Sequence, residues 1–141
     1  MIKSRFVLLC LILAPVSLLA QDPSALFHQT FDLEDFNGIK LEAHTNDSIR
    51  VEKWVGNQLM IETNIKMLNG RRSLLDHYLE KGRWALDTTI NGDQLHFAAH
   101  SPVRNVLTTN QIEIVEEVNI VFYVPETFES TTLHVWARKE E

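Results

Sequence analysis

Cysteine is almost absent from this sequence, and its single copy lies near the N-terminus. Cys10 sits inside an apolar stretch and follows Leu8 and Leu9. Lipid attachment requires small residues just before the cysteine, so we expect Cys10 to belong to a hydrophobic leader and to carry no anchor. Once that leader is removed, no thiol remains. Disulfides, a cysteine nucleophile and thiolate metal sites are then excluded.

A long uninterrupted apolar run is also missing. Lys3 and Arg5 precede the apolar residues Phe6–Ala14, Pro15 breaks the run, and the small residue Ala20 lies before a predicted cleavage point. This order is typical of a secretory signal peptide. The alternative is a retained membrane anchor, but a span needs ~20 apolar residues. We therefore expect export to the periplasm or the cell surface, with no transmembrane segment after cleavage.

The predicted organisation is a signal peptide over residues 1–20 and a single β-rich domain over residues 21–141. A domain of this length can bury a modest but sufficient core.

Basic residues are scarce as well. The chain has 13 Lys and Arg against 19 Asp and Glu, and loss of Lys3 and Arg5 with the leader leaves 11 against 19, a net charge of −8. Nucleic acids and anionic membranes are bound by clustered Lys and Arg. The one basic cluster, Arg71-Arg72 with Lys81 and Arg83 nearby, is too small for that role. We expect no nucleic-acid partner.

Catalytic signatures are missing too. The sequence contains no Gly-x-Ser-x-Gly elbow, no phosphate-binding loop and no dinucleotide fingerprint. A glycosidase would need two carboxylates facing each other across a cleft, and the sequence does not single out such a pair. We predict that the chain is not an enzyme. A hydrolase with acidic catalysis remains the least favoured alternative.

What the sequence does contain is a ten-residue repeat. Ile39–Glu42, Ile49–Glu52 and Leu59–Glu62 share the order aliphatic, any residue, aliphatic, Glu, and turn-forming residues separate the copies. Alternation of period two between turns predicts half-buried strands. Two arrangements remain open: a meander or sandwich stack, or a two-sheet solenoid-like stack. In the solenoid, Glu42 would lie near Glu62.

The remaining pattern predicts an all-β fold of about eight short strands with one short helix. Ser73–Lys81 has helical spacing, with Ser73 as the expected cap and Asp76 in a capping-box position. Asn91-Gly92 predicts a hairpin, and residues 100–111 read as a loop. Residues 112–124 predict a long strand or a bulged pair, and a last strand is expected through Leu133, Val135 and Ala137.

Three segments together resemble a family. They are Ile49–Thr63, which has the form I-x-V-E-x-W-x-G-x-x-L-x-I-E-T, Lys81-Gly82-Arg83, and Val121–Pro125. In this order, after an export signal, they resemble the adhesin-like exported proteins of Bacteroidetes, of the head-GIN-domain type. The resemblance covers roughly Phe27–Val135. It implies an exported, all-β, solenoid-like fold with no established enzymatic activity.

In that family the Tyr-Val-Pro segment usually precedes several further strands. Here the sequence stops some sixteen residues after Pro125. We expect either a minimal version of the family or a C-terminal truncation.

Histidine is the residue type that invites a metal site. The six histidines are His28, His44, His77, His96, His100 and His134. His96 and His100 have a spacing that chelates zinc on a helix, but Leu95–Ala99 reads as a strand. Four residues along a strand separate two side chains by ~13 Å, too far for one ion. We predict no metal and no cofactor.

The glutamates of the repeat and the three tryptophans are the remaining candidates for binding residues. We expect Glu42, Glu52 and Glu62 to form a solvated charged face. Exposed tryptophans can stack on sugars. Trp84 shares its predicted face with Leu86 and should be core, which leaves Trp54 and Trp136 as the candidate ligand surface.

These observations predict an exported, non-enzymatic envelope or surface protein that acts through its β surface, by adhesion to a cell-surface protein or glycan. The alternative is a carbohydrate-binding module that uses exposed tryptophans. Two exposed tryptophans on one face would favour the alternative, whereas carboxylates facing each other in a cleft would favour the hydrolase.

Overall fold

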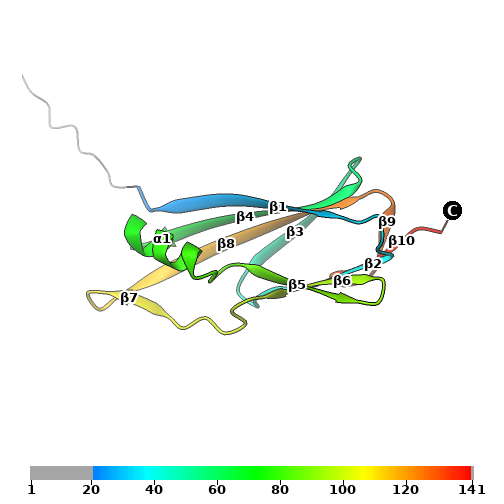
Figure 1. Cartoon of the computed structure of the whole chain (residues 1–141). Helices are drawn as coiled ribbons and strands as arrows, with labels where there is room; N and C mark the ends of the chain where they lie inside the picture. Colours follow the sequence, from blue (N-terminus) through cyan, green and yellow to red (C-terminus); the bar gives the residue numbers. More distant parts are fainter. Residues whose placement is uncertain (1–20, 141) are drawn as a thin grey trace, which may run out of the picture.

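The computed structural model describes residues 21–140, which form an all-β sandwich of two mixed five-stranded sheets (Figure 1). The predicted all-β class is confirmed, and so is the sandwich among the arrangements left open, with ten strands in residues 21–140 instead of about eight. Sheet A contains β1 (Ser24–Asp32), β4 (Gln58–Leu68), β8 (Ile112–Pro125) and β3 (Ser48–Trp54) in that order, with β7 (Leu107–Thr109) paired to β8. Sheet B contains β5 (Leu86–Asn91), β6 (Gln94–Ala99), β2 (Gly38–Glu42), β10 (Val135–Arg138) and β9 (Phe128–Thr132).

The predicted signal peptide, with Cys10, lies outside the described residues. Figure 1 shows β7 and the helix α1 (Arg72–Glu80) at one end of the sandwich, and β2, β9 and β10 at the other.

The core lies between the two sheets, where alternate residues of each strand point inward. On β8, for example, Ile114, Val118, Ile120, Phe122 and Val124 are all buried. Phe122 stacks on a ring from β10 and meets Phe97 of β6 edge to face, with centroids 6.3 Å apart. Burial of each such side chain contributes roughly 1.5–3 kcal/mol. The period-two pattern of the sequence is therefore the pattern that builds this core.

The three copies of the repeat do form strands, but they do not pair with one another. The first copy is β2, which lies between β6 and β10 in sheet B. The second and third are β3 and β4 of sheet A, and β8 separates them. The pairings expected for a meander and for a solenoid are thus both wrong, and Glu42 and Glu62 lie on different sheets. Alternation specifies which face of a strand is buried, but it does not specify the neighbouring strand.

Residues 112–124 form one continuous strand, the first of the two arrangements expected for them. The preceding loop is shorter than predicted because it contains β7. The β7–β8 turn places Asn110 at φ 50° and Gln111 at φ 65°. Positive φ at both central residues is typical of a type I′ hairpin turn. The pair Asn110-Gln111 predicts such a turn less strongly than Asn-Gly does, so the sequence did not reveal this hairpin.

The helix begins one residue earlier than predicted, and its cap is different. Arg71 is the N-cap residue and has an extended backbone without a side-chain capping bond, so the expected cap at Ser73 is wrong. Asp76 forms an ion pair with Arg72 at 2.9 Å. Gly82 ends the segment at φ 68°, as its position suggested. With nine residues, α1 is far too short to cross a bilayer, and no other helix of residues 21–140 could cross one.

The C-terminal region differs most from the prediction. Instead of one strand through Leu133 there is a hairpin, β9 and β10, and Leu133 is 84% exposed in its turn. His134 in this turn has φ 58°. The β9–β10 register also shifts between Val135 and Trp136. As a result Trp136 points into the core.

Candidate functional site

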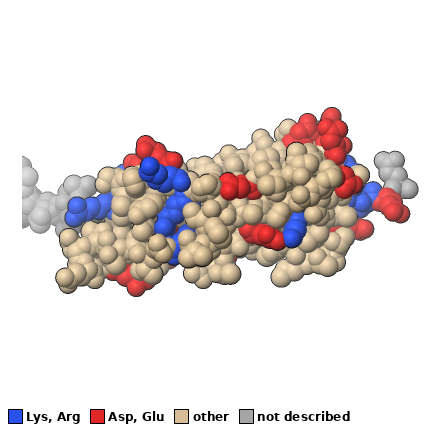
Figure 2. All heavy atoms as spheres, turned by 60° about the horizontal axis from the view of Figure 1, so that its bottom comes forward, with Lys and Arg blue, Asp and Glu red and all other residues tan. Residues whose placement is uncertain are grey.

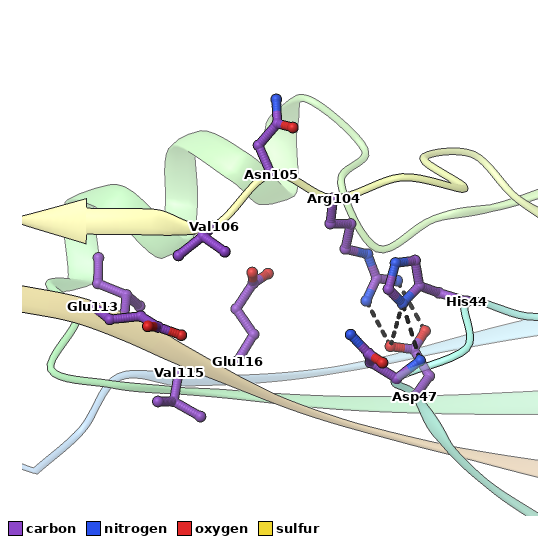
Figure 3. Close-up of a pocket in the computed structure, with 10 residues that line it drawn as sticks. His44, Asp47, Arg104, Asn105, Val106, Glu113, Val115 and Glu116 are labelled. Atoms are coloured by element: carbon purple, nitrogen blue, oxygen red, sulfur yellow. Dashed lines mark hydrogen bonds and ion pairs between the residues drawn. The ribbon is translucent and has the colours of Figure 1, made fainter.

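A small cleft lies where the turn before β3, the loop before β7 and the first half of β8 meet (Figure 3). Its volume is about 210 Å³, below the ~300–1,000 Å³ of ordinary ligand pockets. Four charged side chains, a histidine, two amides and three aliphatic residues line it: Asp47, Arg104, Glu113, Glu116, His44, Asn46, Asn105, Val106, Ile114 and Val115. Its charged groups decide what chemistry it can support.

Asp47 and Arg104 form the first of two buried ion pairs. The two guanidinium nitrogens Nη1 and Nη2 donate to the two carboxylate oxygens at 2.5 and 2.8 Å. The side chains are only 2% and 7% exposed. Arg104 Nε also donates to the backbone oxygen of Arg83 at 3.3 Å. This bidentate geometry fixes the loop before β7 against the turn that enters β3.

Glu116 and Arg83 form the second pair. Glu116 occupies an inward position of β8, between Ile114 and Val118, where an apolar residue would be expected. Arg83 Nε and Nη2 each donate to its carboxylate at 2.8 Å, and Trp84 Nε1 donates at 2.8 Å.

The surroundings of Glu116 hold it ionised. Burial raises the pKa of its carboxyl group, but the hydrogen bonds and charge of Arg83, with the indole of Trp84, lower it more. The net pKa lies below the ordinary value. The same hydrogen bonds raise the pKa of Arg83, which also donates to the backbone oxygen of Asn105 at 2.7 Å.

We call Asp47, Arg104, Glu116 and Arg83 the arginine clasp. It joins four parts of the chain: β8, the segment that follows α1, the loop before β7 and the turn before β3. Asp47 and Glu116 do line one cleft, the feature that would favour a hydrolase. However, each is engaged by an arginine, and Glu116 holds no proton at neutral pH. A general acid needs a raised pKa, so the clasp fits a structural role and does not fit acid catalysis.

Sequence reasoning missed the clasp. The signal for it was Glu116, the one charged residue in the inward set of an otherwise apolar strand.

The glutamates of the repeat lie on the outer faces of the sandwich, as expected for a charged face. Glu42 pairs with Lys40 at 2.5 Å and Glu52 pairs with Arg50 at 3.0 Å. The hydrogen bond and charge of Lys40 lower the pKa of Glu42. Glu62 lies 2.9 Å from His28 of β1. Each carboxylate thus has a cationic or imidazole neighbour and does not converge with the other two.

Of the two histidines considered for zinc, His96 lies within β6, which is a strand as predicted, and His100 directly follows that strand. His96 Nε2 is 3.2 Å from Glu42, and His100 Nδ1 is 3.0 Å from Asp87. Within residues 21–140, no group of three or more metal-ligating side chains is suitably clustered.

The tryptophans are distributed differently from the expected platform. Trp84 is buried, as predicted. Trp136 is only 3% exposed and stacks on Phe122, with centroids 6.4 Å apart and planes 9° from parallel. It therefore offers no face to a ligand, which corrects its assignment to the ligand surface. Trp54 is half-buried on the outer face of sheet A, beside Tyr123 at a centroid distance of 6.3 Å.

That outer face also carries a shallow groove of about 400 Å³ across β4, β8 and β3. Its floor and walls are mostly polar: Ser48, Arg50, Glu62, Asn64, Lys66, Glu117, Asn119, Ile120 and Val121. Asn64 and Asn119 are register partners on adjacent strands, and both are exposed. The groove thus presents neutral hydrogen-bonding side chains, those of Ser48, Asn64 and Asn119, beside four charged ones.

In Figure 2 the lower side of the molecule in Figure 1 is turned toward the viewer. This side carries sheet B. Lys and Arg are interspersed with Asp and Glu on this view, and most of the surface carries neither. Such a surface offers no continuous basic track on the side that the figure shows.

Comparisons of the chain with models of known protein families, with curated proteins and with solved structures found no match. The two surfaces that remain as guides to function are the cleft closed by the arginine clasp and the open groove on sheet A.

Proposed function

We propose that this chain is an exported, non-enzymatic binding protein of the cell envelope, which acts through the outer face of sheet A. Adhesion to a surface component is the general form of this activity. The leader pattern at residues 1–20 and the family resemblance support export. The observation that carries the binding role is the open polar groove beside Asn64 and Asn119. Solvent-facing amides on a rigid sheet can exchange water for ligand without rearrangement of the fold.

The two paired carboxylates of the cleft, those of Asp47 and Glu116, do not fit acid catalysis, for an electrostatic reason. A hydrolytic pair would leave one carboxyl group able to give a proton. Here Arg83 and Trp84 stabilise the charged form of Glu116, and Arg104 engages both oxygens of Asp47. The clasp stabilises the binding face from behind because β8 carries Glu116 on one side and Asn119 on the other.

The test uses the full chain, expressed with its own N-terminus in a bacterial host and followed by cell fractionation. We expect a processed protein in the periplasmic or surface fraction. The purified product should then co-sediment with isolated cell envelopes.

A variant of the groove, Asn64→Ala with Asn119→Ala and Arg50→Ala, should co-sediment less. Thr89→Ala is the matched control because Thr89 is exposed on sheet B. An unprocessed cytoplasmic product, or equal sedimentation of groove variant and control, would contradict the proposal.

A carbohydrate-binding module is the alternative, although not through two exposed tryptophans, because Trp84 and Trp136 are both buried. Trp54 is on the same face as the groove, and Tyr123, not Trp136, is its aromatic neighbour. Aromatic side chains beside amides are a combination that can bind sugars.

A further inference from the structure

We propose that the outer face of sheet A binds an uncharged oligosaccharide that lies along β8, from the Trp54–Tyr123 pair to the Asn64–Asn119 pair. This inference rests on the proposed binding role of that face and names the ligand class. Three independent features of the face lead to it: a fixed aromatic end, a row of neutral hydrogen-bonding side chains, and a balance of charge between them.

The aromatic end is held in place before any ligand arrives. Trp54 Nε1 donates to the backbone oxygen of Gln58 at 3.0 Å. The indole packs against Gly56 so closely that a Cβ there would lie 2.5 Å from the ring. The planes of Trp54 and Tyr123 are inclined at 59°. Because the indole is fixed, stacking on a sugar ring costs little side-chain entropy.

The polar end is a row of neutral side chains across three strands. Asn64 of β4 faces Asn119 of β8, and Ser48 of β3 is the next register partner of Asn119. An amide has two donors and an acceptor oxygen with two lone pairs, and a hydroxyl group both donates and accepts. A row of such groups matches the hydroxyl groups of a sugar, each of which is also donor and acceptor.

The charges of the groove balance. Arg50 and Lys66 oppose Glu62 and Glu117 among its lining residues. Arg50 is also paired with Glu52 and Lys66 with Asp22, two carboxylates outside the lining, and Glu62 lies beside His28. Because both cations of the groove already have carboxylate partners, the groove gives no electrostatic advantage to a uronic acid or a phosphorylated glycan over a neutral one.

The distance between the two ends sets the size of the ligand. Tyr123 and Asn119 are four residues apart on β8, which corresponds to ~13 Å along a strand. A single sugar ring cannot reach both ends. The ligand is therefore an oligosaccharide, and affinity should increase with chain length until both ends are occupied.

Isothermal titration calorimetry of the purified, processed full chain tests the inference. The probes are cellotetraose, xylotetraose, mannotetraose and chitotetraose as neutral chains, their monosaccharides, and tetragalacturonate as an acidic chain. We expect saturable binding of at least one neutral tetrasaccharide, with weaker binding of its monosaccharide and of tetragalacturonate.

Variants separate specific binding from accidental contact. Asn64→Ala and Asn119→Ala should each weaken binding about 2- to 10-fold, the effect of one lost hydrogen bond. Trp54→Leu should weaken it roughly 3- to 10-fold. Thr89→Ala should leave it unchanged. Asn64 and Asn119 are exposed, so their variants remain informative even where Trp54→Leu lowers stability.

Two results would overturn the inference: no heat of binding for any neutral tetrasaccharide at millimolar concentration, or binding that both asparagine variants leave intact. If the chain still sediments with envelopes through the groove, only the ligand class is wrong. If that sedimentation also fails, the proposed function fails with it.

Discussion

Glu116→Gln is the substitution that tests the arginine clasp most sharply. It changes the shape of the side chain little, but it removes the charge that opposes Arg83, a residue only 9% exposed. Removal of one partner of a buried ion pair costs about 3–5 kcal/mol because the other charge stays buried. The Glu116 side chain is 15% exposed, and the glutamine oxygen can still accept the bond from Trp84, so we expect the lower end, about 3 kcal/mol. Against a total stability of ~5–15 kcal/mol for a domain, this is a large loss.

The assay is equilibrium unfolding in urea at pH 7, followed by tryptophan fluorescence. With a slope of ~1–3 kcal/mol/M, the midpoint should fall by roughly 1–3 M. Glu117→Gln is the matched control, one residue further on the same strand but on the exposed outer face. Its unfolding free energy should change by less than about 0.5 kcal/mol.

Arg83→Met combined with Glu116→Gln should recover most of the loss because the unpaired charge is gone. Equal small effects of Glu116→Gln and Glu117→Gln would refute the claim that the clasp stabilises the fold.

Four further outcomes are expected. Asp47→Asn should lower the free energy of unfolding by about 3 kcal/mol, because Arg104 loses its counter-ion. It should also increase hydrogen exchange in residues 101–106. Unchanged exchange there would show that other contacts hold the loop. The wild type should have a higher free energy of unfolding than Glu116→Gln, and the difference should be complete above the ordinary carboxyl pKa of 4.5. The difference should shrink as the pH falls through the lower pKa that Glu116 has in the folded protein. A difference that grows in acid would contradict the lowered pKa of Glu116. Gln111→Gly should stabilise the β7–β8 hairpin by about 0.5–1 kcal/mol, measured by urea unfolding, because φ is positive there. Trp136→Ala should lower the free energy of unfolding by about 3–5 kcal/mol in the same assay, because Trp136 is buried. A small loss would indicate that Trp136 lies on the surface.

The sequence predicts the local features of this fold well because they depend on neighbours in the chain. The alternation around Ile39, Ile49 and Leu59 gives three real strands, and Asn91-Gly92 gives the β5–β6 hairpin, with Gly92 at φ 64°. Leu75 of α1 is buried against the sheets, as its helical spacing requires.

The pairing of distant strands could not be predicted in this way. The parallel pairs β2–β6 and β3–β8 join segments separated by about 55 and 70 residues, and no local pattern encodes them. β9 was missed because its sequence, Phe128 followed by Glu, Ser and two Thr, buries only the phenylalanine. The inward position of Trp136 follows a left-handed residue, His134, and a register shift in the β9–β10 pair, and no local sequence pattern signals either one.

The candidate sites also divide into features that local sequence patterns predict and features that depend on contacts between distant strands. That Trp84 would lie in the core followed from its alternation with Leu86. Trp54 and Trp136 were both left as surface candidates, and for Trp136, which is buried, this assignment is wrong. The clasp required knowledge of tertiary contacts, because Asp47 and Arg104 are 57 residues apart and Arg83 and Glu116 are 33 apart. The groove likewise depends on the insertion of β8 between β3 and β4, which brings Asn64 and Asn119 together.

Chemical-shift mapping of the ¹⁵N-labelled full chain, with the tightest-binding neutral tetrasaccharide as the probe, tests the central claim most directly. The account predicts shifts confined to the outer face of sheet A, at Asn64, Asn119 and Tyr123 and at the indole N–H of Trp54. Shifts concentrated instead at the cleft, at Asn46, Asn105 and Val106, would contradict it.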